Sequence, residues 1–244
     1  MKFTTYTNKG GRKVNEDFIA SRYKNGIYCF AVSDGFGKGG SGTDAAQAAL
    51  NSVLDEFMKN PKLERQALYS YIEAAQKTLL GMKSEKEQWG EMGTAAAVLI
   101  TDGSRAVWAV TGDCRVYVFR GSRISEVSED HSVSFEKFER GEIEYSDIRT
   151  DADANKLRRA LGDRLAWQPD ISEVFNISSA YSFLICTDGF WRCITEEDME
   201  KTRLFSLSSR GWLGKMLKKI APKLESGSDN LSAISITMQR KDSI

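Results

Sequence analysis

The chain has 244 residues, of which 41% are apolar, and its 34 basic and 34 acidic side chains give a formal net charge of zero. Such a balance argues against nucleic acid or a membrane surface as a partner, since both attract an excess of basic residues. The apolar runs Ala95–Ile100 and Ala106–Val110 are too short to span a bilayer. Residues 1–244 are therefore expected to form one large domain without a membrane segment.

The four cysteines form no C-x-x-C pair, and three of them lie in or beside strand-like runs. Reduced and largely buried thiols are the simplest interpretation of this pattern. Residues 1–7 also lack the apolar core of a signal peptide. We therefore expect a cytoplasmic protein, and we expect it to be a monomer.

The first part of the chain contains a predicted strand followed by two predicted helices. Ile27–Val32 is a continuous apolar run typical of a buried strand. Thr43–Met58 has apolar residues at the i, i+3, i+4 spacing of one helix face, and the pair Asn60-Pro61 ends it. Leu63–Leu80 repeats the same spacing. We expect two amphipathic helices here.

Three short β-rich runs come next, at Gly93–Thr101, Arg105–Thr111 and Arg115–Arg120. The residues between them, 101–104 and 112–114, contain the glycine and aspartate that are typical of hairpin turns. We therefore expect all three runs to be neighbours in an antiparallel sheet.

The remainder of the chain mixes a polar segment with strands and a helix. Glu129–Asp163 is too long for an ordinary connection, which indicates a surface insertion with a functional or regulatory role. Phe183–Thr187 and Leu231–Met238 are predicted strands, and Trp212–Ile220 is a predicted helix. Helices set among hairpin strands favour an α+β layered sandwich over alternating βαβ units.

Three acidic motifs stand at the edges of apolar runs. Asp34-Gly35 and Asp188-Gly189 each end such a run, and Asp229 precedes another. Asp-Gly is also a common turn pair, so one motif alone has an ordinary structural explanation. Three carboxylates at similar strand edges instead favour a shared site for hard cations such as Mg²⁺ and Mn²⁺, which prefer oxygen ligands.

A glycine-rich stretch at residues 35–40 satisfies the G-x-G-x-x-G pattern of dinucleotide-binding folds. Asp34 would place a carboxylate beside the pyrophosphate, and Asp55 and Glu56 lie inside a predicted helix and not at the end of a second strand. The hairpin strands that follow also disfavour a parallel sheet. We therefore reject the dinucleotide interpretation.

A possible phosphate site lies near the start of the chain. Arg12 precedes Glu16 and Asp17, and arginine can bind two phosphate oxygens at once. Two divalent cations held by carboxylates can activate a shared water molecule to attack phosphorus, while the arginine neutralises charge on the phosphoryl oxygens. This combination predicts hydrolysis of a phosphoester without a nucleophilic side chain.

These motifs resemble the metal-dependent serine/threonine phosphatases of the PPM class, the type 2C phosphatases, in their bacterial form. The match extends through nearly the whole chain, in the order found in the family. Its motifs are Arg12-x-x-Asn15-Glu16-Asp17, Ser33-Asp34-Gly35-Phe36-Gly37, Gly93-Thr94-Ala95, Gly112-Asp113-Cys114-Arg115-Val116-Tyr117, Asp130-His131-Ser132, Leu161-Gly162, Thr187-Asp188-Gly189 and Asp229-Asn230.

The resemblance implies a four-layer α-β-β-α sandwich with two central antiparallel sheets, and two Mn²⁺ or Mg²⁺ ions between them with a possible third. Asp34 would bridge both ions and the Gly35 carbonyl would complete one, whereas Asp188 and Asp229 would hold the other. Asp113 would share a third ion with Asp188. The full set of implied metal-site residues is Glu16, Asp17, Asp34, Gly35, Asp113, Asp188 and Asp229. The implied catalytic residues are Arg12, Asp34 and Asp188, with Arg12 binding the substrate phosphate.

The resemblance also implies a function, namely hydrolysis of phosphoserine and phosphothreonine in proteins, opposing a serine/threonine kinase. The alternative is a catalytically silent member that only binds partners, but such members are expected to lose metal carboxylates, and this chain keeps Asp34, Asp188 and Asp229. Residues of about 132–163 would form a flap subdomain that borders the site and influences substrate choice.

Three positions depart from the family pattern or lack an assigned role. Phe36 stands where many eukaryotic members have a histidine that is a candidate general acid. His131, the only histidine, is interpreted as a packing residue of its loop and not as that acid. Cys114 replaces the usual serine; a redox-sensitive thiol is one interpretation and a small buried filler is the favoured one.

Overall fold

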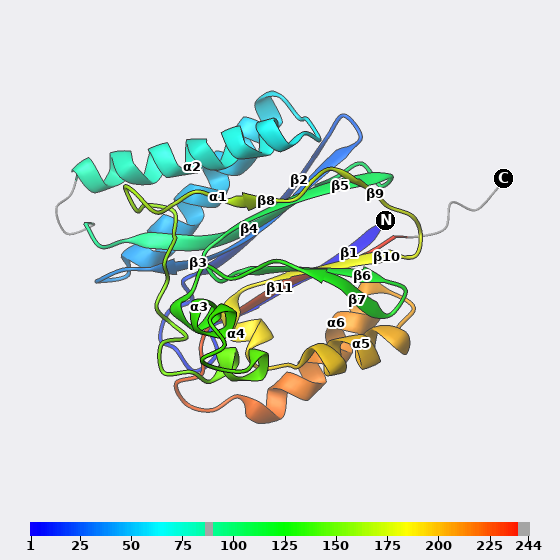
Figure 1. Ribbon diagram of the computed structural model, residues 1–244. Helices are drawn as coiled ribbons and strands as arrows, with labels where there is room; N and C mark the ends of the chain where they lie inside the picture. Colours follow the sequence, from blue (N-terminus) through cyan, green and yellow to red (C-terminus); the bar gives the residue numbers. More distant parts are fainter. Residues whose placement is uncertain (86–89, 239–244) are drawn as a thin grey trace.

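A computed structural model describes residues 1–85 and 90–238 of the chain. Two antiparallel sheets stack face to face (Figure 1). The first sheet contains, in spatial order, β1 (Lys2–Asn8), β11 (Leu231–Thr237), β10 (Tyr181–Cys186), β6 (Arg115–Arg120) and β7 (Arg123–Val127). The second contains β2 (Asp17–Lys24), β3 (Ile27–Phe36), β4 (Gly93–Thr101), β5 (Arg105–Thr111) and β8 (Asp170–Ile171), and the short β9 (Phe175–Asn176) also pairs with β5.

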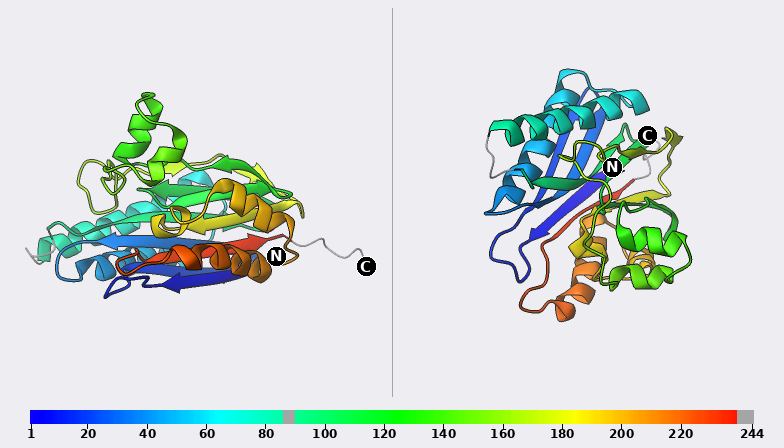
Figure 2. Two further views of the ribbon diagram at one scale, coloured as in Figure 1. Left: turned by 90° about the horizontal axis from the view of Figure 1, so that it is seen from below. Right: turned by 60° about the vertical axis from the view of Figure 1, so that its left-hand side comes forward.

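Helices cover the outer face of each sheet. The second sheet is covered by α1 (Ser41–Lys59) and α2 (Arg65–Glu85), and the first by α5 (Glu196–Leu204) and α6 (Ser209–Ile220) (Figures 1 and 2). The one-turn helix α4 (Asp188–Trp191) directly follows β10, and η3 (Ala221–Lys223) follows α6. The expected α+β sandwich with two central antiparallel sheets is confirmed.

Alternation along β3 shows how the layers are built. Phe30 and Val32 point into the apolar cluster between the two sheets, whereas Cys29 and Ala31 point into the cluster beneath α1 and α2. Successive strand residues face opposite sides of a sheet, so a strand covered on both sides must be apolar throughout. Each large side chain buried in this way contributes about 1.5–3 kcal/mol to stability.

One predicted turn has a different structure. Residues 112–114 do not close a hairpin, because β5 pairs with β4 and β8 whereas β6 pairs with β10 and β7. The segment instead carries the chain from one sheet to the other. Gly112 has a φ of 89°, so a tight crossover uses the same left-handed glycine that a hairpin turn uses, and local sequence does not separate the two. The consequence is that Asp113 lies at the end of the sandwich, between the sheets.

The predicted surface insertion forms a small subregion of its own. It contains the helix α3 (Val133–Glu139) and the 3-10 helix η2 (Tyr145–Arg149), and it projects beyond the edge of the sheets (Figure 2, left). Lys137 lies 3.0 Å from Asp151 and 2.8 Å from Asp153, so ion pairs hold the subregion together internally.

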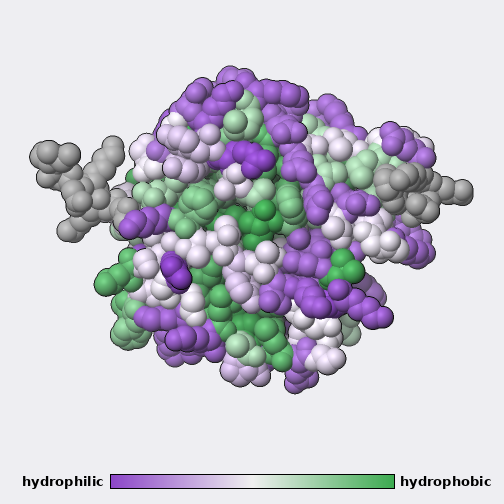
Figure 3. Space-filling view, turned by 180° about the vertical axis from the view of Figure 1, so that it is seen from behind, coloured by the Kyte–Doolittle hydropathy of each residue, from purple (hydrophilic) through white to green (hydrophobic). Residues whose placement is uncertain are grey.

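The surface carries apolar patches separated by hydrophilic side chains on the face opposite to the one in Figure 1 (Figure 3). Exposed large apolar residues include Leu204 at the end of α5, and Phe205 and Leu207 between α5 and α6. Among the helices of residues 1–85 and 90–238, none is both long enough and apolar enough to cross a membrane.

Candidate metal and phosphate site

A cavity of about 820 Å³ opens at one end of the sandwich. Its walls come from the segment between β1 and β2, the end of β3, the crossover from β5 to β6, and the residues that flank α4 and β11. The predicted site residues that line it are Arg12, Glu16, Asp34, Gly35, Asp113, Asp188 and Asp229. Asp17 is buried beside Asp34 in the second sheet.

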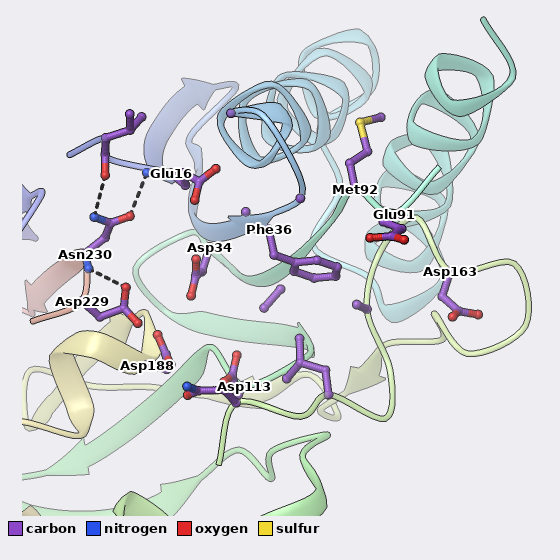
Figure 4. Close-up of a pocket in the computed structure, with 18 of the residues that line it drawn as sticks. Glu16, Asp34, Phe36, Glu91, Met92, Asp113, Asp163, Asp188, Asp229 and Asn230 are labelled. Atoms are coloured by element: carbon purple, nitrogen blue, oxygen red, sulfur yellow. Dashed lines mark hydrogen bonds between the residues drawn. The ribbon is translucent and has the colours of Figure 1, made fainter. Parts of the chain in front are cut away.

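Strand register explains why these carboxyl groups meet. Asp17 on β2 is the direct cross-strand partner of Asp34 on β3. Asp188 follows β10 and Asp229 precedes β11, and these two strands are antiparallel neighbours, so both residues lie at the same sheet edge. Figure 4 shows the side chains of Asp34, Asp113 and Asp188 directed toward one another. We refer to Asp17, Asp34, Asp113, Asp188 and Asp229 as the carboxyl cluster.

The two Asp-Gly pairs are not ordinary turns. Gly35 lies within β3, and a Cβ atom there would lie 1.9 Å from the carbonyl oxygen of Gly42 in α1. Gly189 lies in α4, and a Cβ atom there would lie 2.0 Å from the carbonyl oxygen of Asn230. The glycines are therefore required for close backbone packing, which fixes the neighbouring aspartates in place.

The carboxyl cluster has an excess of negative charge. Burial raises the pKa of Asp34 well above its usual range, and the neighbouring carboxylates of the cluster raise it further. Burial and the charge of Asp188 likewise raise the pKa of Asp113. Burial also raises the pKa of Asp17 to about 7, although hydrogen bonds from Thr187 and Ser232 oppose the shift. A cation within the cluster would relieve this repulsion.

Two arginines supply part of the missing positive charge. Arg12 Nη2 donates to Asp229 Oδ2 at 3.0 Å, and both side chains remain accessible, at 52% and 36% exposure. Arg192 was not identified from the sequence. Its guanidinium lies 3.2 Å from Asp113 Oδ2 and 3.0 Å from Asp188 Oδ2.

The donor set fits a hard divalent cation. Among the described residues, Oδ1 of Asp17 and Oδ1 of Asp188 are buried without a hydrogen-bond partner, and such oxygens are costly unless a ligand satisfies them. In residues 1–85 and 90–238, no group of three or more histidine, cysteine, aspartate or glutamate side chains is already arranged to hold a metal ion. An ion would compete with Arg12 for Asp229 and with Arg192 for Asp188.

Comparison with known proteins identifies the family. The sequence model described as protein phosphatase 2C matches residues 8–224, which is most of the chain. The chain belongs to the protein phosphatase 2C family. The expected membership of the PPM class, with its bacterial type, and the expected class of enzyme, a protein serine/threonine phosphatase, are thereby confirmed.

Individual relatives match this chain over most of their length. The chain is 28% identical over 211 residues to the serine/threonine phosphatase stp of Listeria monocytogenes, covering 83% of this chain and 81% of the relative. The crystal structure of the Mycobacterium tuberculosis phosphatase PstP/Ppp superposes with a TM-score of 0.85 at 17% identity, covering 98% and 99% of the two chains. A structure of the PstP catalytic domain in complex with two manganese ions gives a TM-score of 0.82 at 18% identity, covering 97% of each chain.

Two further residues of this protein phosphatase 2C member position the cluster. The Thr187 hydroxyl donates to Asp17 Oδ2 at 2.9 Å and accepts from the Ser232 N–H at 3.1 Å, which joins the two sheets. Asn230 Oδ1 accepts from the Glu16 N–H at 2.8 Å. The family motifs contain Thr187 and Asn230, but only the assembled fold shows their partners.

His131 lies outside the cavity and supports the crossover at Asp113. Its Nδ1 accepts from the Gly112 N–H at 3.2 Å, and its backbone N–H donates to the Gly112 carbonyl at 2.9 Å. Its Nε2 lies 3.0 Å from Asp170 Oδ2. The interpretation of His131 as a packing residue agrees with these contacts.

Cys114 and Phe36 differ in their access to the cavity. Cys114 is fully buried in the apolar cluster between the sheets, and burial raises the pKa of its thiol well above the usual range. Reactive thiols need the opposite environment, so the structure favours the buried filler. Phe36 is 40% exposed and its ring lies along the cavity (Figure 4).

Proposed function

We propose that this protein phosphatase 2C member hydrolyses phosphoserine and phosphothreonine in proteins with the help of two Mn²⁺ or Mg²⁺ ions. The main support is that Asp34, Asp188 and Asp229, which are far apart in the sequence, line the same cavity. Ions held there would lower the pKa of a water molecule and neutralise charge on the transferred phosphoryl group. The reaction then needs no nucleophilic side chain.

Each residue of the site has a distinct proposed task. Asp34 would serve both ions and the Gly35 carbonyl would serve one of them, whereas Asp188 and Asp229 would hold the other. Asp17 would act from behind Asp34, where its buried Oδ1 has no hydrogen-bond partner among the residues that the structure describes. Glu16, whose pKa is raised mainly by burial, adds charge from the cavity wall.

Arg12 is the proposed ligand of the substrate phosphate. Its side chain is half exposed at the cavity, and its guanidinium already holds one carboxylate oxygen of Asp229. A planar guanidinium binds two phosphate oxygens in the same way that it binds a carboxylate. We propose that Arg12 exchanges Asp229 for the phosphate when substrate and ions are bound.

The leaving group takes its proton from water in this proposal. Phe36 occupies the position after the bridging Asp-Gly, and a phenyl ring has no proton to give. His131 faces Asp170 in a separate small cavity. Water entering the cavity is the proposed donor.

The substrate and setting are proposed from the family. We propose a single catalytic domain, monomeric and cytoplasmic, which reverses the action of a serine/threonine kinase. Residues 132–163 serve as the flap, since Asn155, Leu157 and Asp163 of this segment line the same cavity as Asp34, Asp113 and Asp188. A catalytically silent binding module is disfavoured because every cluster carboxylate is retained.

The direct test is turnover of p-nitrophenyl phosphate and of a phosphothreonine peptide by the purified protein, with Mn²⁺ and with chelator. We expect hydrolysis of both substrates that disappears in chelator. Equal rates in the two conditions, or no turnover in either, would reject the proposed function.

Asp188→Asn tests the site itself. Loss of one ligand charge weakens ion binding, so we expect kcat to fall by roughly 10²-fold or more while the melting temperature changes little. Asp198→Asn is the matched control, because Asp198 lies on α5 and pairs with Lys219 away from the cavity. Full activity of Asp188→Asn would remove Asp188 from the proposed mechanism.

A further inference from the structure

Arg192 joins two carboxylates that belong to different parts of the fold. Its Nη1 lies 3.0 Å from Asp188 Oδ2, one helical turn earlier, and its Nη2 lies 3.2 Å from Asp113 Oδ2 on the crossover between the sheets. The side chains of Asp113 and Asp188 are each 6% exposed, and that of Arg192 is 16% exposed. The three groups therefore form a buried triad with one cation between two anions.

The same guanidinium also reaches the flap. Its Nη2 donates to the Ala154 carbonyl at 2.6 Å, and its Nη1 donates to Asn155 Oδ1. The guanidinium lies 5.3 Å from the centre of the Trp191 ring. Trp191 is itself fixed, because its indole N–H donates to the Asp113 carbonyl at 2.8 Å. Arg192 thus links the flap to the carboxyl cluster through one side chain.

We propose that Arg192 is a built-in cation that takes the place of a third metal ion between Asp113 and Asp188, and that it positions the flap segment at residues 154–155. The inference rests on the proposed function, since it concerns the number of ions at the same site. It means that this chain binds two ions and not three.

A third ion would compete with the Arg192 guanidinium for both carboxylates. An arginine side chain stays protonated at any physiological pH, and here it is tethered to the helix that carries Asp188. Its position at i+4 from Asp188 is the spacing at which oppositely charged helix residues meet. A third ion would have to displace the guanidinium from both carboxylates and from the Ala154 carbonyl. Breaking buried, charge-assisted contacts of this kind is unfavourable.

The test counts bound Mn²⁺ by equilibrium dialysis and by native mass spectrometry, with folding checked by circular dichroism. We expect two ions in the wild type and two in Asp113→Asn, three in Arg192→Met, and two again in the double variant Arg192→Met/Asp113→Asn. Arg149→Met is the matched control with two ions expected. Arg149 is similarly buried, at 10% exposure, and lies 5.5 Å from the same Trp191 ring, but it pairs with Glu196.

Each result decides the matter. Three ions in the wild type that fall to two in Asp113→Asn would overturn the inference and leave the proposed function standing, as would two ions in a folded Arg192→Met. No bound ion in the wild type would reject the proposed function and the inference together. If Arg192→Met fails to fold, the comparison of wild type with Asp113→Asn still decides the ion count.

Hydrogen exchange tests the link to the flap without reference to ions or turnover. In chelator, the amides of residues 150–158 should exchange faster in Arg192→Met than in the wild type, and at the wild-type rate in Arg149→Met. Arg192→Lys, which keeps the charge but not the planar fork, should give an intermediate rate. Unchanged exchange in Arg192→Met would overturn the positioning role.

Discussion

Arg12 and Arg192 both pair with aspartates of the carboxyl cluster, but they differ in their exposure to solvent. The pair between Arg12 and Asp229 is open to solvent, with side chains that are 52% and 36% exposed. Arg192 is 16% exposed and faces two carboxylates that are each 6% exposed. Exposed ion pairs contribute about 0–1 kcal/mol, whereas breaking a buried pair by removing one partner typically costs about 3–5 kcal/mol.

This difference assigns the arginines different tasks. Arg12 stands on the connection between β1 and β2, and its exchange of Asp229 for another anion costs little. Arg192 follows α4 and has acceptors on three parts of the fold, so it is a fixed part of the site. The outer end of the cluster, at Asp229, is therefore suited to binding a substrate. The inner end, at Asp34, Asp113 and Asp188, is suited to holding charge in place.

The largest effect is expected for Asp34→Asn, at the inner end. Asp34 is partly buried, and this burial together with the neighbouring carboxylates raises its pKa. Losing the proposed bridging ligand should remove several kcal/mol of transition-state stabilisation, or roughly 10³-fold in kcat. The same change should raise the melting temperature in chelator, because it removes a carboxyl group whose charge the folded state disfavours.

The two readouts of Asp34→Asn must move in opposite directions. Steady-state kinetics with Mn²⁺ and calorimetry in chelator measure them separately. Full activity of Asp34→Asn would contradict the role of Asp34 as an ion ligand. A melting temperature below that of the wild type in chelator would show that repulsion among the carboxylates does not destabilise the folded protein at Asp34.

The next largest effect is expected for Arg12→Ala, at the outer end. We expect KM for p-nitrophenyl phosphate to rise roughly 10- to 100-fold, since one charge-assisted contact to phosphate is worth about 1.5–3 kcal/mol. The free energy of unfolding should change by less than about 1 kcal/mol, because the pair with Asp229 is exposed. Arg22→Ala, on the exposed part of β2, is the control and should leave KM unchanged.

An unchanged KM in Arg12→Ala would count against phosphate binding by Arg12. A large loss of stability would instead show that the outer pair is as fixed as the inner one, and the contrast between the two arginines would be lost.

Local sequence patterns predict the strands that are covered on both faces. The bounds of β4, β5 and β6 are those expected from the apolar runs alone. The strands β1 and β2 were not predicted, since they are polar and β1 has exposed residues on both faces. The prediction that β6 lies in the same sheet as β4 and β5 was also wrong. Residues 112–114 have a turn sequence that fits a hairpin and a crossover equally well.

Local sequence also predicts part of the site, namely the residues that lie beside apolar runs. Asp34, Asp188 and Asp229 lie where apolar runs of the sequence end or begin, so local sequence reveals them. Arg192 escaped notice because α4 is a single turn with no periodic pattern, and its partners Asp113 and Ala154 are distant in sequence. Contacts of that kind depend on how the two sheets and the flap meet, which no local pattern records.

A smaller effect is expected for Thr187→Val, which removes the hydroxyl between Asp17 and Ser232. Both partners are buried and lose a hydrogen bond, so urea denaturation should show a loss of about 1–3 kcal/mol. Thr111→Val is the control, because the Thr111 hydroxyl lies at the longer distance of 3.4 Å from the Trp167 carbonyl. Equal losses in the two variants would mean that the hydrogen bonds of Thr187 between the sheets stabilise the protein no more than the longer contact of Thr111.

The smallest expected effect concerns pH and the His131 ring beside the crossover. Burial lowers the pKa of His131 below its usual value of 6.5, although Asp170 opposes the shift. The neutral ring accepts the Gly112 N–H at Nδ1, and protonation would remove this acceptor. The unfolded chain therefore binds more protons below pH 6.5, so the stability due to His131 is complete above that pH and declines as the pH falls through the folded pKa.

Urea denaturation of the wild type and of His131→Asn between pH 8 and pH 5 measures the contribution of His131 to the free energy of unfolding. His131 is the only histidine, and the carboxyl cluster titrates in both proteins, so its contribution cancels in the difference. We expect the stability advantage of the wild type over the variant to shrink as the pH falls below 6.5. A constant difference would mean that the imidazole titrates alike in the folded and unfolded chains. A growing difference would mean that the folded protein prefers the protonated ring, and Asp170 would then outweigh burial at this end of the crossover.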